Sequence, residues 1–122
     1  MAEWTPAQRQ AIDARNHSIL VSAAAGSGKT SVLVERLMEL LRGGARIERV
    51  LVVTFTNAAA ADMRSRLMDR LGEEARDNAH LRRQLQAINR ADISTLHTFC
   101  RRLIIRHFQA VGADPGSRVA DE

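Results

Sequence analysis

A single lysine in a loop of small residues is the feature of the sequence most suited to chemistry. Of the 18 lysines and arginines in the chain, only Lys29 is a lysine. It belongs to the segment Ala23–Thr30, which fits the phosphate-binding pattern G-x-x-x-x-G-K-[ST] except at the first position, where Ala23 replaces glycine. A compact ammonium on a flexible stem can reach a phosphate from a tight loop, whereas a planar guanidinium favours paired contacts. The sequence therefore predicts a phosphate-binding loop with Lys29 as its cation.

The neighbours of Lys29 fit the same chemistry. Gly26 and Gly28 allow a left-handed backbone and a close approach to a ligand. The backbone amides from Gly26 to Thr30 can then surround an anion, and a helix that begins at Lys29 adds the positive end of its dipole. Thr30 offers a hydroxyl to Mg²⁺. The predicted nucleotide-binding residues of this loop are Ala25, Gly26, Ser27, Gly28, Lys29 and Thr30, with Lys29 and Thr30 as the catalytic pair.

Predicted strands and helices place this loop at the end of a strand. The apolar run 18–23 predicts a buried strand, and the helix 29–42 that follows the loop ends at Gly43-Gly44. The continuously apolar segment Val50–Phe55 predicts a second strand, covered on both faces as in a parallel sheet. Strand, helix, strand and helix in this order predict an α/β fold, a parallel sheet with flanking helices.

Further elements complete this outline. Thr5 and Pro6 are typical of a helix start, so we expect a helix from Pro6 to about Arg15. Cys100 falls on the apolar face of a later helix, so we interpret it as a core residue rather than a nucleophile. The other predicted elements are helices over 58–71, 73–89 and 96–110 and a short third strand over 91–95.

Polar and aromatic residues follow two of the predicted strands. Phe55, Thr56 and Asn57 come at the end of one strand, where ligands of open parallel sheets gather. Chemistry alone favours a core phenylalanine and a helix cap here, although Phe55 could also stack on a base. Thr95 and His97 repeat this layout after the third strand. Thr95 could cap the next helix and His97 could donate a hydrogen bond to a phosphate, or both could be structural residues.

Gln8 is a further candidate, fourteen residues before Ser22 at the start of the loop region. An amide side chain can donate and accept hydrogen bonds on an adenine edge at the same time. Chemistry alone nevertheless favours an exposed polar residue of the first helix.

The composition sets broad limits on the function. The net charge is +4 and the pI is about 10.9, which is compatible with a polyanionic partner as well as with a solvated basic surface. No apolar run reaches the ~20 residues of a membrane span, so we expect no membrane partner. Cys100 is the only cysteine, which excludes an internal disulfide and favours the cytoplasm.

Four segments resemble motifs of the UvrD-like superfamily 1 helicases. Trp4–Gln8 is similar to their adenine-reading Q motif, and Ala23–Thr30 to their motif I, which often has alanine at its first position. Val52–Met63 is similar to motif Ia, and Ile93–Cys100 to the next motif, which contacts single-stranded DNA. The resemblance implies a P-loop NTPase (RecA-like) fold, of which the chain would form part of domain 1A.

Within the superfamily, the chain is most similar to the AddA family, the helicase–nuclease subunits of AddAB complexes. This implies ATP and Mg²⁺ as cofactors, single- and double-stranded DNA ends as substrates, and a heterodimer with an AddB-type subunit. The full protein would unwind and degrade DNA ends for recombinational repair. The segments that carry the similarity are Ala23–Thr30, Thr54–Ala61, Arg82–Leu85, Asn89-Arg90, Ser94–Cys100, Asp114–Gly116 and Arg118–Glu122.

The resemblance also assigns roles to residues. It implies that Gln8 contacts adenine, Lys29 the terminal phosphates and Thr30 the Mg²⁺ ion. Ala58 departs from the pattern, because many UvrD-like helicases have lysine there, so one contact to a DNA phosphate would be missing. The residues implied to contact single-stranded DNA are Phe55, Thr56, Asn57, Thr95 and His97.

The same resemblance implies an N-terminal fragment. The acidic strand end and the arginine finger of a complete motor belong further along the family's chain. We expect residues 1–111 to be the N-terminal part of the RecA-like ATP-binding domain and 112–122 a polar extension into further sequence. Such a fragment should hydrolyse ATP poorly by itself.

Two other functions fit the loop alone. Kinases, GTPases, transporters and motor ATPases share such loops, so the loop does not decide the reaction. A small P-loop kinase would suit the length of the chain, but it leaves Thr54–Asn57 and Thr95–Cys100 without a role. A non-enzymatic nucleic-acid-binding module would use the loop for structure only.

Overall fold

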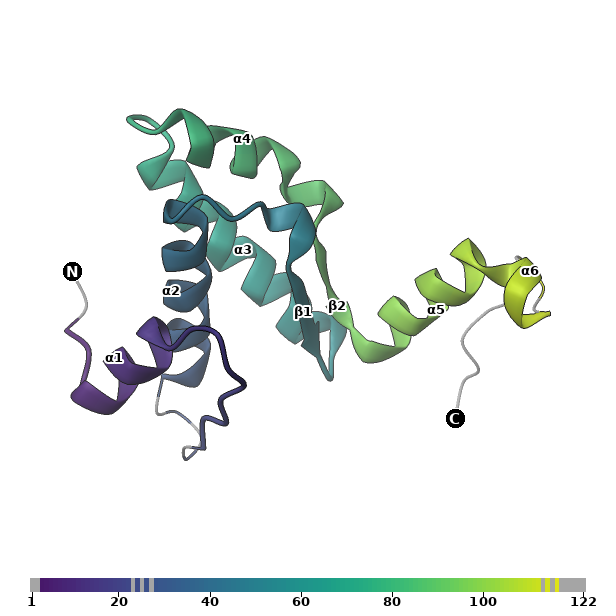
Figure 1. The fold of residues 1–122 in the computed structure, drawn as a ribbon, viewed down its shortest axis with the longest axis horizontal. Helices are drawn as coiled ribbons and strands as arrows, with labels where there is room; N and C mark the ends of the chain where they lie inside the picture. The colour runs from purple at the N-terminus through teal and green to yellow at the C-terminus, as the bar shows by residue number, and fades with distance from the viewer. Residues whose placement is uncertain are drawn as a thin grey trace.

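Helices pack against one face of a small parallel sheet in this α/β chain (Figure 1). A computed structural model describes residues 3–22, 24, 26, 28–112, 114 and 116. No described helix combines the length and the apolar character needed to cross a membrane. The helices are α1 (Pro6–Asp13), α2 (Lys29–Arg42), α3 (Asn57–Glu74), α4 (Ala79–Ala87), α5 (Leu96–Arg106) and α6 (Phe108–Val111). The short 3-10 turns are η1 (Ile47–Arg49) and η2 (Ile88–Arg90), and the strands are β1 (Leu51–Thr54) and β2 (Asp92–Thr95).

The two strands pair in parallel, as the sequence predicts. Leu51 lies opposite Asp92 and Thr54 lies opposite Thr95, so β1 and β2 begin and end at the same level. Helices α3 and α4 connect the two strands, and α3 packs against both of them. The residues that follow Thr54 and Thr95 therefore leave the sheet at one common edge.

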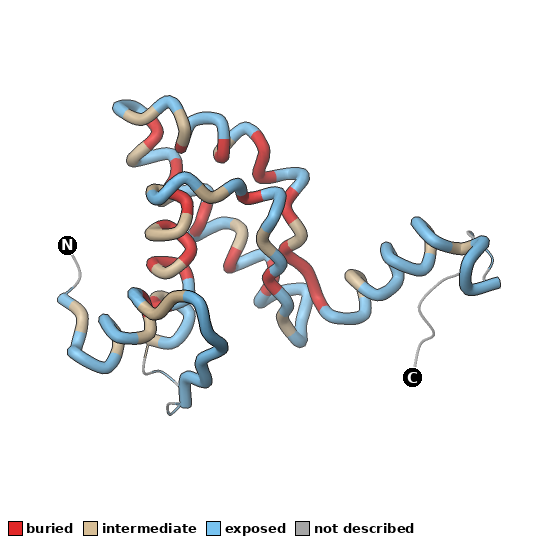
Figure 2. Tube along the Cα trace, viewed as in Figure 1, coloured by how far each residue is buried: buried red, intermediate tan, exposed pale blue. Residues whose placement is uncertain are grey.

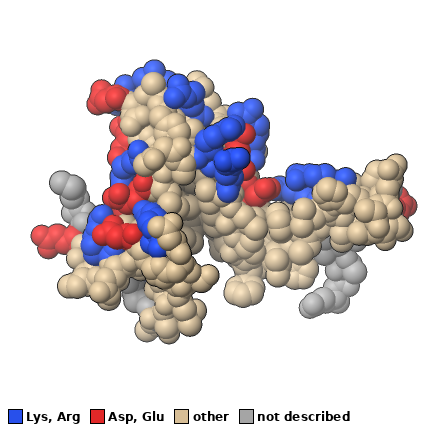
Figure 3. Space-filling view, viewed as in Figure 1, with Lys and Arg blue, Asp and Glu red and all other residues tan. Residues whose placement is uncertain are grey.

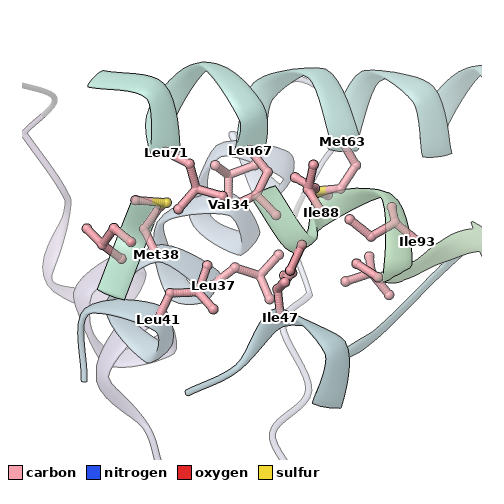
Figure 4. Packing of buried hydrophobic residues seen from close by; sticks show 14 residues of the cluster. Val34, Leu37, Met38, Leu41, Ile47, Met63, Leu67, Leu71, Ile88 and Ile93 are labelled. Carbon is pink, nitrogen blue, oxygen red and sulfur yellow. The ribbon is translucent and has the colours of Figure 1, made fainter. Parts of the chain in front are cut away.

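The hydrophobic core lies between α2, α3, α4 and the sheet. Figure 2 shows buried residues along the facing sides of these elements, and Figure 4 shows how their side chains interlock. Leu37 and Leu41 from α2 meet Leu67 and Leu71 from α3, and Ile47 of η1 closes the cluster. Each fully buried aliphatic side chain stabilises the fold by about 1.5–3 kcal/mol relative to an exposed one. The core therefore fixes α2, which begins at the predicted phosphate loop, against α3 and α4.

An ion-pair network joins α2 to α3 beside this core. Arg42 donates to both carboxylate oxygens of Glu74 at 2.8 Å and to Oε1 of Glu35 at 2.9 Å, while Arg70 donates to Oε2 of Glu35 at 2.6 Å. Burial alone would raise the pKa of Glu35, but the hydrogen bonds from Arg42 and Arg70 outweigh it and lower that pKa. Glu35 therefore stays ionised, and the network adds a polar link between the two helices.

The structure corrects the prediction of a first strand over 18–23. Residues 18–22 form no strand, Ala23 lies outside the described residues, and Leu20 is 93% exposed. Among the described residues the sheet consists of β1 and β2, so no strand pairs with this run. An apolar run becomes a strand only where a neighbouring edge accepts its hydrogen bonds.

The sheet is covered on one face rather than on both. Val52 is buried, whereas Leu51 and Val53, which point to the other face, are 47% and 41% exposed. The prediction of a doubly covered strand over 50–55 is therefore wrong for this chain. No described helix lies over the face that Leu51 and Val53 present.

The predicted helix 96–110 is also corrected. The structure divides it into α5 and α6 at His107, whose backbone leaves the helical region, and none of its residues is buried. The exposed residues include Cys100, so its interpretation as a core residue is wrong. Figure 1 shows the reason: α5 projects away from the other helices, so its apolar face meets no core.

The remaining helices agree with the predictions apart from their ends. Helix α2 has the predicted bounds, and α1 ends two residues early at Asp13. Helix α3 continues to Glu74, and the next helix begins only at Ala79, because Asn78 caps it by accepting from the Leu81 amide at 3.1 Å.

Candidate nucleotide and DNA site

The N-terminus of α2 is built differently from those of the neighbouring helices. Its cap is Gly28, with φ +85°, and no side chain of the described residues accepts from the first amides of α2. Gly26 also has a positive φ of +80°. Helices α1, α3, α4 and α5 instead begin with the side-chain caps Thr5, Thr56, Asn78 and Thr95. The first amides of α2 therefore have no side-chain cap among the described residues, which is the arrangement that phosphate loops use.

Lys29 and Thr30 are the first two residues of α2, and both are exposed. A hollow of about 400 Å³ lies beside Lys29, which lines it together with Val21 and Val32. The cationic side chain and the hydroxyl thus stand at the positive end of the α2 dipole, as the sequence predicts. Two residues of the predicted set, Ala25 and Ser27, lie outside the described residues.

Gln8 lies next to this loop. Its Oε1 accepts a hydrogen bond from the Thr5 amide at 2.9 Å, and the Thr5 hydroxyl accepts from the Gln8 amide at 3.2 Å. This reciprocal pair starts α1 as a capping box. On its other side, Nε2 of Gln8 faces Gly28: a Cβ built there would lie 3.4 Å away. The structure therefore brings the predicted adenine and phosphate residues together.

Arg36 fixes α1 against α2, and the sequence analysis did not identify it. Its Nη1 donates to the carbonyls of Ala11 at 2.8 Å and Ala14 at 2.6 Å, at the C-terminal end of α1. A guanidinium at a helix C-terminus satisfies open carbonyls and complements the dipole. The only signal in the sequence is its spacing of seven residues from Lys29, which places both on one side of α2.

A second, larger hollow does not coincide with the predicted site. It has a volume of about 900 Å³ and lies between α1 and the segment 17–22. Neither Gln8 nor Lys29 lines it.

The end of β1 presents the predicted aromatic residue to solvent. Phe55 is 98% exposed, which contradicts the alternative of a core phenylalanine. Thr56 is the cap of α3, because its hydroxyl accepts from the Ala59 amide at 3.1 Å. Asn57 follows as the exposed first residue of α3. An exposed aromatic ring next to a polar helix start is suited to stack on a base.

The end of β2 is also followed by a capped helix, but here the capping side chain is buried. Thr95 is buried, and its hydroxyl accepts from the Thr98 amide at 3.2 Å and donates to the Thr98 hydroxyl at 2.9 Å. His97 is exposed, one residue inside α5. Since Thr54 pairs with Thr95, Phe55 and His97 leave the same edge of the sheet. The structure thus groups the residues predicted to contact DNA, with His97 more accessible than Thr95.

Comparison with known proteins shows extended similarity. Residues 4–122 match the family model of the UvrD/REP helicase N-terminal domain. Among curated relatives, an ATP-dependent helicase/nuclease subunit of Heliobacterium modesticaldum is 53% identical over 123 residues. The proteins of the same name from Syntrophomonas wolfei and Alkaliphilus metalliredigens are 52% and 49% identical over 125 and 126 residues.

These alignments cover 98–99% of the chain but only 9–10% of each relative. The chain thus spans about a tenth of the length of the curated relatives it matches. The shared names favour a helicase over the small kinase and over the non-catalytic module.

Proposed function

This chain belongs to the UvrD/REP helicase N-terminal domain family, and from that membership we propose that it is the N-terminal ATP-binding part of an ATP-dependent DNA helicase/nuclease. The full protein would unwind and degrade the ends of DNA double-strand breaks for recombinational repair. Helicase and nuclease activity are named for the relatives, and their extension to this protein is part of the proposal.

The observation that carries the proposal is the start of α2. Two glycines with positive φ, Gly26 and Gly28, precede a helix whose first amides have no side-chain cap among the described residues, and the only lysine of the chain follows at once. Backbone amides and the α2 dipole would hold the phosphates of ATP, and Lys29 would place its charge on the terminal phosphates. Thr30 would hold Mg²⁺ through its hydroxyl, and the ion would neutralise charge on the phosphates.

The rest of the predicted set has a structural context that fits this assignment. Gln8 would recognise adenine beside the loop, although its Oε1 is already engaged by the Thr5 amide. Ala25 and Ser27 would complete the loop. We assign five residues at the carboxyl ends of β1 and β2 to single-stranded DNA. They are Phe55, Thr56, Asn57, Thr95 and His97.

The wider organisation follows from the same family. We assign residues 1–111 to the N-terminal part of a P-loop, RecA-like domain 1A and 112–122 to a polar extension; of the latter, 113, 115 and 117–122 lie outside the described residues. The partner would be an AddB-type protein in a cytoplasmic heterodimer acting on DNA ends. Since the chain aligns with only 9–10% of each relative, we propose that residues 1–122 alone hydrolyse ATP poorly.

The test compares ATP hydrolysis with and without single-stranded DNA in the full-length gene product, expressed with its candidate partner protein. We expect strong stimulation by DNA in the wild type and its loss in Lys29→Ala. Lys29→Ala with unchanged stimulated hydrolysis would refute the assignment of the loop. Hydrolysis that is indifferent to DNA would refute the helicase assignment and return the P-loop kinase to consideration.

A further inference from the structure

The end of the sheet opposite the predicted site is rich in arginine. Turn η1 leads into β1 and η2 leads into β2, so both turns lie at the amino ends of the strands, and α4 packs on both. Figure 3 shows basic side chains over this end of the molecule and along α4. Five exposed arginines lie on these three elements or just before η1. We call them the arginine face: Arg46, Arg49, Arg82, Arg83 and Arg90.

Little acidic charge offsets this face. The segments 45–50 and 79–90 contain five arginines and a single acid, Glu48. Two arginines share that carboxylate: Glu48 Oε2 lies 3.3 Å from Arg46 Nη2, and Glu48 Oε1 lies 3.1 Å from Arg90 Nη2. The guanidinium groups of Arg49 and Arg83 form no ion pair or hydrogen bond with any other described residue. The face therefore carries a surplus of positive charge.

Buried and partly buried hydrogen bonds hold the backbone of the arginine face in place. Oε1 of Gln84, a buried side chain of α4, accepts from the Ile47 amide of η1 at 2.8 Å. His80 of α4 donates to the Ala45 carbonyl at 3.0 Å. Arg64 of α3 donates to the carbonyls of Ile88 at 3.0 Å and Ile93 at 3.1 Å. The arginines thus stand on a fixed platform, which lowers the entropy lost when a ligand binds.

The composition of the face distinguishes between ligands. The segments 45–50 and 79–90 contain no Phe, Trp or Tyr, and one exposed large apolar side chain, Leu51 at the start of β1, borders them. Protein interfaces depend on apolar and aromatic anchors, and single-strand binders stack bases on aromatic rings. A duplex needs neither, because its phosphates meet guanidinium groups directly. We infer that the arginine face binds the phosphate backbone of duplex DNA.

This inference rests on the proposed function and adds a second DNA surface to it. The predicted single-strand contacts lie at the carboxyl ends of β1 and β2, whereas the arginine face surrounds their amino ends. A strand of four residues spans about 13 Å, so the two surfaces lie at opposite ends of the sheet. One molecule can thus hold the duplex and the separated strand at different places.

The experiment uses the full-length protein in complex with its partner protein, together with two fluorescent probes, a blunt hairpin duplex and an oligo-dT single strand. Binding is measured by anisotropy over a range of salt concentrations for Arg49→Gln/Arg83→Gln. We expect duplex affinity to fall about tenfold and the slope of log K against log salt to fall by about 2, with oligo-dT affinity unchanged. The control Arg9→Gln/Arg66→Gln removes two exposed arginines elsewhere and should leave duplex affinity at the wild-type value.

The other outcomes also decide the question. Duplex affinity and salt slope equal to those of the control pair would overturn the inference. An equal fall in oligo-dT affinity would also overturn it. So would a variant pair that keeps its duplex affinity but no longer co-purifies with the partner protein, which would identify an acidic protein surface as the ligand. Wild-type protein that binds neither probe would overturn the proposed function as well. Retained ATP hydrolysis with single-stranded DNA shows that the variant pair is folded.

Discussion

The side-chain nitrogen of Gln8 faces Gly28, the cap of α2, whose backbone is left-handed. A Cβ built on Gly28 would lie 3.4 Å from Nε2 of Gln8. The two residues are twenty positions apart in the chain and come from separate sequence motifs. Their contact joins the start of α1 to the proposed phosphate loop. A change at either residue should therefore affect the binding of both ends of a nucleotide.

Replacing Gly28 by alanine tests this contact. At φ +85° an alanine costs about 1–2 kcal/mol, and its Cβ would come into contact with Nε2 of Gln8 at 3.4 Å. We expect Gly28→Ala in the full-length protein to bind ATP about tenfold more weakly, measured by titration with a fluorescent ATP analogue. In the control Gly72→Ala, the added Cβ meets no atom within 4 Å in helix α3, so ATP affinity should stay unchanged. Equal affinities for wild type and Gly28→Ala would contradict the role of the loop.

Removal of Arg36 should loosen α1 without touching the loop. The Arg36→Met variant loses the donor to the Ala11 and Ala14 carbonyls, so amide hydrogen exchange in α1 should increase. Because α1 carries Gln8, we expect KM for ATP to rise several-fold while kcat changes little. Arg15→Met is the matched control: Arg15 donates to Ile12 and Ala14 at the same helix end but does not reach α2. An unchanged KM in Arg36→Met would show that the position of α1 does not matter for ATP.

The ionised state of Glu35 predicts a dependence of stability on pH. Although burial works against it, the hydrogen bonds from Arg42 and Arg70 keep the folded pKa of Glu35 below its ordinary value of 4.5. The unfolded chain binds a proton first as the pH falls, so this stabilisation is complete above pH 4.5 and is lost as the pH falls through the folded pKa. At neutral pH, Glu35→Gln should lower the free energy of unfolding by about 1–3 kcal/mol.

The measurement is urea unfolding of the purified chain, wild type and Glu35→Gln, from neutral pH to about pH 3. The difference between the two proteins should shrink as the pH falls below 4.5. Comparing the two removes the contribution of the other carboxylates, which titrate in both. A difference that stays constant over this range would mean that Glu35 does not titrate with folding.

Local signals in the sequence predicted much of the fold. Helix α2 has its predicted bounds because glycines stand on both sides of it, and β1 and β2 form the predicted parallel pair. The run 18–22 has the same apolar character as β1 and yet forms no strand. Strand formation depends on a neighbouring edge, and helix burial on a partner, so a local pattern could not predict the exposure of this run or of α5.

The candidate site shows the same limit. Spacing identified Lys29 and Thr30, and their place at the start of α2 follows from the glycines alone. The contact of Gln8 with Gly28 and the hold of Arg36 on α1 depend on how two helices pack, which no motif contains. Both required the tertiary structure, because contacts across twenty or more residues leave no periodic signal.

The exposed ring of Phe55 allows DNA binding to be separated from stability. At 98% exposure, Phe55→Ala removes almost no packing, so the free energy of unfolding should stay within about 0.5 kcal/mol of the wild-type value. Loss of one stacked base costs about 1–3 kcal/mol, so affinity for oligo-dT should fall about 5- to 150-fold, while Phe55→Tyr should keep most of it. Met68→Ala is a control on α3, since that side chain is exposed but far along the helix from the end of β1. Wild-type affinity in Phe55→Ala, measured by anisotropy with the full-length protein, would exclude stacking at this edge and leave Thr56, Asn57 and His97 as the remaining exposed candidates there.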